Sequence, residues 1–406
     1  MRILLPLFIV LLWVSCSQET PKLQQGPWRA ILQLQNDTEL PFIMEVHNTT
    51  TLTIKNAEER ILVDEVRIYG DSISIQAPVF EGIFKGVLSE EGKKITGHFS
   101  KPSLDRIVPF TMTYGEATRF PLNNTNDKAV NISGNWETVF SPDTDTDRYI
   151  AKGIFKQSGK DVTGTFSTTT GDYRYLEGVL EGNQLKLSTF DGAHAFLFKA
   201  VVTDSTMNGT FYSGNHWQEP FTARKNEHYE LPDATTLTYL KEGYDRFSFA
   251  FPDETGKTIS LEDEQFKDKV VLVQIMGTWC PNCMDESKYY VQYLREHPDS
   301  ALEIVALAFE YAPTQEKAFA SIKRLKEKLN VPYPIVLAQF GSVDKALAQE
   351  KLPMLNHVLS YPTTIFIDKK GEVKRIHTGF NGPATGEKHL AFKEDFEAFV
   401  GQLLSE

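Results

Sequence analysis

The sequence contains few cysteines: only three occur among its 406 residues, at positions 16, 280 and 283. Three cysteines cannot form a framework of several structural disulfides, so the fold must be stabilised by buried apolar side chains. A chain of this length is also too long for one ordinary hydrophobic core. The sequence therefore predicts two or three domains.

Positive charge is scarce as well. Lysine and arginine together number 42 and aspartate and glutamate 54, which gives a formal net charge of -12 at pH 7. Binding to nucleic acids or to anionic membrane surfaces requires a positive field on the protein. We therefore expect no nucleic-acid partner, and the charge favours proteins or small molecules as partners.

The apolar run near the N-terminus, residues 3–14, is too short to cross a bilayer as a helix. It follows a single positively charged residue, Arg2. This arrangement is typical of a secretory signal peptide, so the sequence predicts export.

Cys16 directly follows a small residue, Ser15, at the end of this run. The ending resembles the lipobox of bacterial lipoproteins, although Trp13 stands where that family usually has leucine. The resemblance implies a signal peptide over residues 1–16, lipidation of Cys16, a polar tether over 17–25, and a membrane anchor that does not span the bilayer. Cleavage by an ordinary signal peptidase near Ser15 or Cys16 is the alternative.

Residues 26–225 consist of short alternating apolar and polar runs separated by Gly, Asn and Asp, a pattern typical of β-strands. The region also repeats, because Gly26-Pro27-Trp28 opens one part and Gly134-Asn135-Trp136 the other. The sequence therefore predicts an all-β region with two similar halves, 26–115 and 132–225. We expect up-and-down meanders that form a barrel or a sandwich.

A Gly-x-Trp segment before a run of strands resembles the start of a lipocalin-type barrel. Two functions are compatible with this region: a ligand cup or docking surface for a substrate protein, and a spacer that holds the following domain away from the membrane. The sequence shows no cluster of convergent polar or aromatic residues, which favours the spacer.

The C-terminal part contains a buried-strand pattern that leads directly into a pair of cysteines. Six of the seven residues in 270–276 are apolar, as in a strand covered on both faces. Cys280-Pro281-Asn282-Cys283 then begins an apolar-periodic segment that predicts a helix over 281–296. Because the first turn of a helix has unpaired amides and the positive end of its dipole, this position favours a thiolate at Cys280.

Further strands and helices follow, including a strand over 302–309 and a final helix over 392–404. They predict an α/β domain over 242–406, with a mixed central sheet flanked by helices, after a linker over 226–241.

Four features of this domain resemble the TlpA/ResA-like branch of the thioredoxin-fold thiol-disulfide oxidoreductases. They are Gly277-Thr278-Trp279-Cys280-Pro281-Asn282-Cys283, Glu286, the segment Tyr361-Pro362 before the apolar run 363–367, and a hairpin over 247–261. The resemblance implies a reductase of protein disulfides in the bacterial cell envelope, facing the periplasm. It also implies a membrane thiol electron donor, and no cofactor besides a redox-active Cys280–Cys283 disulfide.

The resemblance also implies roles for the two cysteines. Cys280 attacks the substrate disulfide, and Cys283, one helical turn away, resolves the mixed disulfide. Trp279, Pro281, Tyr361 and Pro362 are expected to form the substrate surface, with Pro362 as a cis-proline that faces the dithiol.

Glu286 is expected to assist proton transfer; a solvated helix carboxylate is the alternative. Thioredoxins proper carry a buried aspartate six residues before the first cysteine, where this chain has Gln274. The identity of the general base is therefore open.

Three other functions were compared with this hypothesis. A zinc site requires ligands beyond Cys280 and Cys283, and the histidines of the domain are scattered. A peroxiredoxin requires Pro-x-x-x-Thr-x-x-Cys, whereas Val273 and Gly277 occupy the first two of these positions. A reductase of peroxides or small thiols with the same fold remains an alternative, as does a β-barrel ligand-binding or docking lipoprotein with an accessory redox domain.

Overall fold

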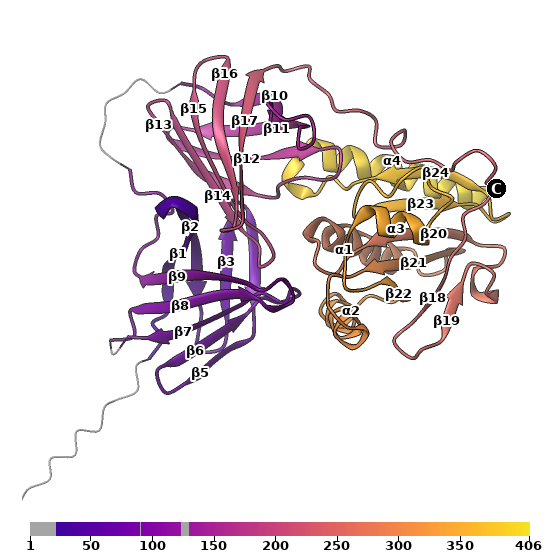
Figure 1. Cartoon of the computed structure of the whole chain (residues 1–406), viewed down its shortest axis with the longest axis horizontal. Helices are drawn as coiled ribbons and strands as arrows, with labels where there is room; N and C mark the ends of the chain where they lie inside the picture. The colour runs from indigo at the N-terminus through magenta and orange to yellow at the C-terminus, as the bar shows by residue number, and fades with distance from the viewer. Residues whose placement is uncertain (1–21, 90, 123–129) are drawn as a thin grey trace, which may run out of the picture.

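The computed structural model describes residues 22–89, 91–122 and 130–406. Two β units lie next to each other, and a C-terminal α/β unit packs against both (Figure 1). The predicted signal peptide and Cys16 lie outside the described residues. None of the described helices is long and apolar enough to cross a membrane.

The first β unit is a nine-stranded antiparallel sheet with the strand order β4-β3-β2-β1-β9-β8-β7-β6-β5. Its strands are β1 (Gly26–Gln33), β2 (Glu39–Val46), β3 (Leu52–Asn56), β4 (Glu59–Val63), β5 (Val66–Tyr69), β6 (Ser72–Gln76), β7 (Ile83–Leu88), β8 (Lys94–Lys101) and β9 (Arg106–Tyr114).

The second β unit is a closed antiparallel barrel in which each strand pairs with the next and the last pairs with the first. Its strands are β10 (Gly134–Phe140), β11 (Tyr149–Ser158), β12 (Asp161–Thr168), β13 (Leu176–Glu181), β14 (Gln184–Phe190), β15 (Ala195–Val202), β16 (Thr206–Ser213) and β17 (Trp217–Lys225). Alternate residues point inward and fill the barrel with aromatic side chains, among them Phe140, Phe166 and Phe198.

The two units begin with the same local arrangement. Trp28 and Trp136 lie at equivalent places in the first strand of each unit, and both are fully buried. Each indole nitrogen donates a hydrogen bond to a backbone carbonyl four residues earlier, at 2.9 Å to Gln24 and 2.8 Å to Ile132. The same local arrangement therefore begins one extended sheet and one closed barrel.

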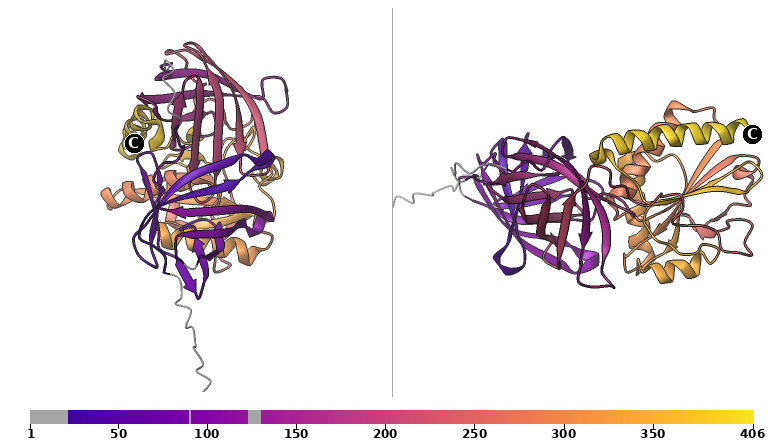
Figure 2. Two further views of the ribbon diagram at one scale, coloured as in Figure 1. Left: turned by 90° about the vertical axis from the view of Figure 1, so that its left-hand side faces the viewer. Right: turned by 90° about the horizontal axis from the view of Figure 1, so that it is seen from above.

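The C-terminal unit contains a five-stranded mixed sheet with the order β22-β21-β20-β23-β24. β22, β21 and β20 run parallel to one another, β23 runs antiparallel to β20, and β24 runs antiparallel to β23. Helices lie on both faces of this sheet (Figure 2). The elements are β18 (Ala250–Pro252), β19 (Thr258–Ser260), β20 (Val270–Met276), α1 (Pro281–Glu296), β21 (Leu302–Phe309), α2 (Gln315–Leu329), β22 (Ile335–Gln339), α3 (Lys345–Lys351), β23 (Thr363–Ile367), β24 (Val373–Thr378) and α4 (Glu387–Ser405).

The fold class predicted from the sequence is confirmed: an all-β region precedes a thioredoxin-like α/β unit. β20, α1 and β21 have the predicted bounds. Two predicted elements differ. The hairpin over 247–261 is reduced to the three-residue strands β18 and β19, and the final helix begins at Glu387 because Gly386, with φ of 60°, ends the preceding short helix there.

A buried arginine joins all three units. Arg174 lies between β12 and β13 of the barrel, and only 3% of its side chain is exposed. Its guanidinium contacts Glu59 of the first sheet, Asp191 of the barrel at 3.3 Å, and Asp285 of α1. One buried charge cluster therefore connects the first sheet, the barrel and the redox unit.

Replacing Arg174 by alanine should lower the free energy of unfolding by about 3–5 kcal/mol, because the carboxylates around it would stay buried without a cation. The measurement is urea unfolding followed by far-UV circular dichroism. Arg224→Ala is the matched control, since the Arg224 side chain is 72% exposed and pairs with Glu137 on the surface. An equal loss in the free energy of unfolding for the two variants would contradict the stabilising role of the cluster.

Candidate active site

The two cysteines lie where β20 ends and α1 begins. Cys280 is the residue that caps α1, and its sulfur accepts a hydrogen bond from the backbone amide of Cys283 at 3.3 Å. Pro281 occupies the first helical position, where a missing amide hydrogen costs nothing. Both thiols are unpaired in the structure. The first turn of α1 therefore offers a backbone donor to the sulfur of Cys280.

The two thiols differ in burial. Cys280 is 7% exposed and Cys283 is fully buried. Burial, together with the nearby Cys280 sulfur, raises the pKa of the Cys283 thiol well above its ordinary value. Cys283 is thus protonated at neutral pH and needs a base before it can attack.

The residues predicted to form the substrate surface surround Cys280. The Tyr361–Pro362 peptide bond is cis, as predicted, and the Cys280 thiol donates a hydrogen bond to the Tyr361 carbonyl at 3.3 Å. The ring of Trp279 meets that of Tyr361 at a centroid distance of 5.7 Å, and its indole nitrogen donates to the Phe309 carbonyl at 2.9 Å. The structure therefore brings these residues together around one sulfur.

Glu286 is fully buried, so the alternative of a solvated helix carboxylate is wrong. Its carboxylate accepts hydrogen bonds from the Gln274 amide at 2.7 Å and from the Thr364 hydroxyl at 3.0 Å. Burial raises the pKa of Glu286 to about 7, against the lowering effect of these hydrogen bonds. The Gln274 amide also lies 3.5 Å from the Cys283 carbonyl, so it connects Glu286 with the resolving cysteine.

Sequence reasoning missed a second buried carboxyl group, Glu310, which follows β21 directly. Its two oxygens accept hydrogen bonds from the amide and the hydroxyl of Thr278, both at 2.7 Å, and burial raises its pKa to about 7. Glu310 therefore holds the loop that leads to Cys280. Its signal in the sequence is an acidic residue at the carboxyl end of a buried parallel strand, on the sheet edge that also carries the dithiol.

A loop of the barrel, residues 168–174 from the end of β12 toward β13, packs against the first turn of α1 next to the dithiol. The Asn282 amide donates to the Asp172 carbonyl at 3.2 Å, and the Ser360 hydroxyl donates to the Thr170 carbonyl at 2.8 Å. Gly171 has φ of 148°, and a Cβ atom there would lie 1.9 Å from the Asn282 amide nitrogen. The loop consequently fits against the first turn of α1 only with glycine at its tip.

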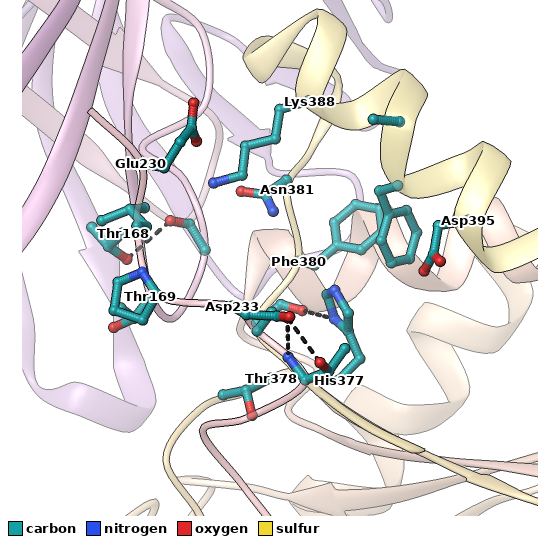
Figure 3. A pocket seen from close by; sticks show the side chains of 18 of the residues that line it. Thr168, Thr169, Glu230, Asp233, His377, Thr378, Phe380, Asn381, Lys388 and Asp395 are labelled. Carbon is teal, nitrogen blue, oxygen red and sulfur yellow. Dashed lines mark hydrogen bonds between the residues drawn. The ribbon is translucent and has the colours of Figure 1, made fainter. Parts of the chain in front are cut away.

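A cavity of about 430 Å³ opens on the other side of this loop, between the loop, the segment 230–235 and α4 (Figure 3). His377 and Lys388 are among the side chains that line it, and neither cysteine is. Burial lowers the pKa of His377 to about 4, so this imidazole is neutral at physiological pH. The cavity therefore lies apart from the thiol chemistry. No group of three or more His, Cys, Asp or Glu residues suited to a metal ion occurs in the described ranges.

Comparison with known proteins agrees with this geometry. Residues 230–390 match the family model of Redoxin. The thioredoxin-like protein YneN of Bacillus subtilis (strain 168) is 29% identical over 140 residues, which cover 34% of this chain and 73% of YneN. The thiol-disulfide oxidoreductase ResA of Geobacillus kaustophilus (strain HTA426) is 28% identical over 156 residues, 38% of this chain and 80% of ResA.

A solved structure, that of a putative thiol:disulfide interchange protein DsbE from Chlorobium tepidum, aligns at 18% identity. The alignment covers 40% of this chain and 99% of that one, with a TM-score of 0.30.

Replacing Gly171 by valine should raise the rate at which a maleimide alkylates Cys280 by about tenfold, because the loop can no longer pack against Asn282. A tenfold change corresponds to a loss of about 1.4 kcal/mol in the free energy that keeps the loop in place. The rate is measured on the reduced protein by mass spectrometry. Gly401→Val is the control, since a Cβ atom there would meet nothing within 4 Å. An unchanged rate for the Gly171 variant would show that the loop does not limit access to Cys280.

Proposed function

Since residues 230–390 form a redoxin domain with a complete dithiol, we propose that this thiol-disulfide oxidoreductase reduces disulfides of other proteins in the bacterial cell envelope. The observation that carries the proposal is the position of the Cys280 sulfur. It lies between the Cys283 amide and the Tyr361 carbonyl, each at 3.3 Å. A nucleophilic sulfur, a resolving cysteine and the Tyr361 carbonyl, which could accept a hydrogen bond from a substrate segment, thus meet at one point.

In the first step, the Cys280 thiolate attacks one sulfur of the substrate disulfide. A bond forms between Cys280 and that sulfur, the substrate disulfide breaks, and the released substrate thiolate takes up a proton. The Cys283 amide donates a hydrogen bond to the Cys280 sulfur and holds it at the start of α1 before the attack. Trp279, Pro281, Tyr361 and Pro362 provide the surface on which the substrate segment rests.

In the second step, Cys283 loses its proton to Glu286 and attacks the Cys280 sulfur. The Cys280–Cys283 disulfide forms, and the second substrate thiol leaves reduced. Glu286 suits this role because its pKa, raised to about 7 by burial, lies close to the pH at which it would work. A membrane thiol donor then returns two electrons to the Cys280–Cys283 pair, and no further cofactor takes part.

The proposed location is the periplasmic side of the envelope, with the chain held to the membrane by a lipid on Cys16. The export signal and the small residue before Cys16 support this assignment.

A reductase of small disulfides or peroxides is the second candidate. The observation that supports it is the low exposure of Cys280, 7%, because a small molecule reaches a buried sulfur with less rearrangement of the protein than a protein substrate does.

The Cys283→Ser variant should accumulate as mixed disulfides between Cys280 and envelope proteins, because the resolving thiol is absent. Non-reducing electrophoresis and mass spectrometry of the trapped species make the measurement. A variant that carries both Cys280→Ser and Cys283→Ser is the control and should trap nothing. If the single variant traps no protein although its Cys280 is alkylated readily, the protein-disulfide proposal is replaced by the small-molecule one.

Replacing Glu286 by glutamine should slow the resolution of a Cys280–peptide mixed disulfide by about a hundredfold at pH 7.5 and remove the rise in rate through pH 7. The rate is followed by stopped-flow release of the peptide thiol. Glu296→Gln is the control, because Glu296 lies on the same helix and is exposed. A pH profile identical to that of the unaltered protein would exclude Glu286 as the base.

The same substitution has a separate effect on stability. The pKa of Glu286 is higher in the folded state, about 7, than its ordinary value of 4.5, so the folded state binds more protons between these values and loses stability as pH rises through that window. The glutamine variant should therefore lose less stability between pH 4.5 and 7. Glu310, whose pKa is also raised to about 7 in the folded state, should still cause a loss of stability over the same pH range.

A further inference from the structure

A cavity of about 300 Å³ lies beside Trp279, where all three units meet. The first sheet, the barrel and the α/β unit each contribute two of the side chains that define its chemistry. These are Lys101 and Arg106, His194 and His216, and Trp279 and Tyr311.

The polar lining of this cavity is basic. Among the described residues that line it, no aspartate or glutamate occurs, although the chain as a whole has a net charge of -12. Within the described ranges, neither Lys101 nor Arg106 makes an ion pair. The cavity therefore concentrates basic side chains in a protein whose net charge is negative.

Lys101 shows how little of this charge is compensated. It is 9% exposed, and its ammonium group donates to the neutral carbonyl of Ala193 at 3.0 Å. Burial, together with the nearby Arg106, lowers the pKa of Lys101 to about 8, against the weaker opposite effects of Asp191 and Glu81. Neither of those two carboxylates lines the cavity.

The same positive charges affect the pKa of His216. Burial and the charges of Arg106 and Lys101 lower its pKa to about 4. An anion in the cavity would supply the opposite charge that Lys101 and Arg106 lack there, and it would favour the protonated form of His216.

Trp279 connects the cavity with the nucleophile Cys280. Trp279 precedes Cys280, and its ring contacts Tyr311 at 5.8 Å and Tyr361 at 5.7 Å. The Tyr361 carbonyl in turn accepts the hydrogen bond from the Cys280 thiol. A substrate segment that lies across Trp279 would thus reach the sulfur and the cavity together.

We propose that this basic cavity binds an acidic side chain of the substrate protein, next to the disulfide that Cys280 attacks. The inference rests on the proposed function and adds a substrate class to it. A volume of about 300 Å³ holds one or two side chains and excludes a folded domain. A carboxylate matches the planar guanidinium of Arg106, and the aromatic walls pack against the aliphatic part of a glutamate.

The cavity also assigns a task to the β region. Every basic side chain that lines it comes from the two β units, and the α/β unit supplies the aromatic wall next to the cysteines. The β region is then the part of the protein that selects the substrate, and the sulfur chemistry stays with Cys280 and Cys283.

The test uses two peptides that share one sequence and one disulfide and differ only in a glutamate or a glutamine beside a cysteine. The reduced full chain should reduce the glutamate peptide with a kcat/KM about tenfold higher at low salt, because charge complementarity acts mainly on association and specificity. Arg106→Gln should bring this ratio close to one. Lys94→Gln, which removes an exposed lysine at the start of β8, the strand that ends at Lys101, should leave the ratio unchanged.

Binding is measured separately with labelled serine versions of both peptides, which cannot react, by fluorescence polarisation. Tighter binding of the glutamate version, lost in Arg106→Gln, supports the cavity even if no reduction is seen. Equal reduction and equal binding of the two peptides would overturn the cavity and leave the proposed function intact. No reduction of either peptide by protein with an alkylatable Cys280 would overturn the proposed function alone, and tighter binding of a small dicarboxylate disulfide than of the glutamate peptide would overturn the assignment to a protein segment.

Discussion

One buried positive charge contacts all three units of this protein. The Arg174 guanidinium is removed from water and must be neutralised, and the carboxylates that neutralise it come from the first sheet, the barrel and α1. Breaking only some of the contacts in such a cluster is unfavourable in free energy, because a carboxylate or an arginine that loses its partners stays desolvated. The interface therefore favours a fully closed arrangement, and Asp285 ties this arrangement to the helix that begins at the dithiol.

The closed arrangement explains the burial of the cysteines. The loop that ends at Arg174 continues the same contact across Asn282 and Ser360, and its tip has room only for Gly171. A loop packed next to the dithiol restricts access from that side unless the loop is displaced. The opposing sides of the dithiol are thus controlled differently: the barrel loop covers one, and Trp279 and the basic cavity form the other.

The sequence predicts the centre of the redox unit well and its surroundings poorly. The bounds of β20 and α1 follow from a fully buried strand and from a proline at the first helical position, both of which are local signals. The burial of Glu286 depends instead on Gln274, 12 residues away on a neighbouring strand, and on Thr364, 78 residues away. Helical spacing shows which face of α1 carries Glu286 but not what that face packs against.

Contacts between units are still further from what a sequence pattern can show. Asn282 meets Asp172 across 110 residues of chain, and the cavity beside Trp279 combines side chains from three separate cores. The sequence of the β region shows no convergent polar residues because Lys101, Arg106, His194 and His216 come together only after two sheets and the redox unit have packed.

The basic side chains would also stay together if the redox unit moved. Arg119 links the two β units, with hydrogen bonds to the Lys55 carbonyl of the first sheet at 2.6 Å and to the Ser188 carbonyl of the barrel at 3.2 Å, and no residue of the redox unit takes part in these bonds. The four basic residues lie on these linked units. An acidic substrate segment held there would remain bound while the loop 168–174 separates from α1, and reclosure would return Trp279 and Cys280 to it. The β units could therefore select the substrate while the dithiol becomes accessible in the same reaction cycle. The reason is that the proposed anion site lies on the β units, on one side of the contact between the loop 168–174 and α1.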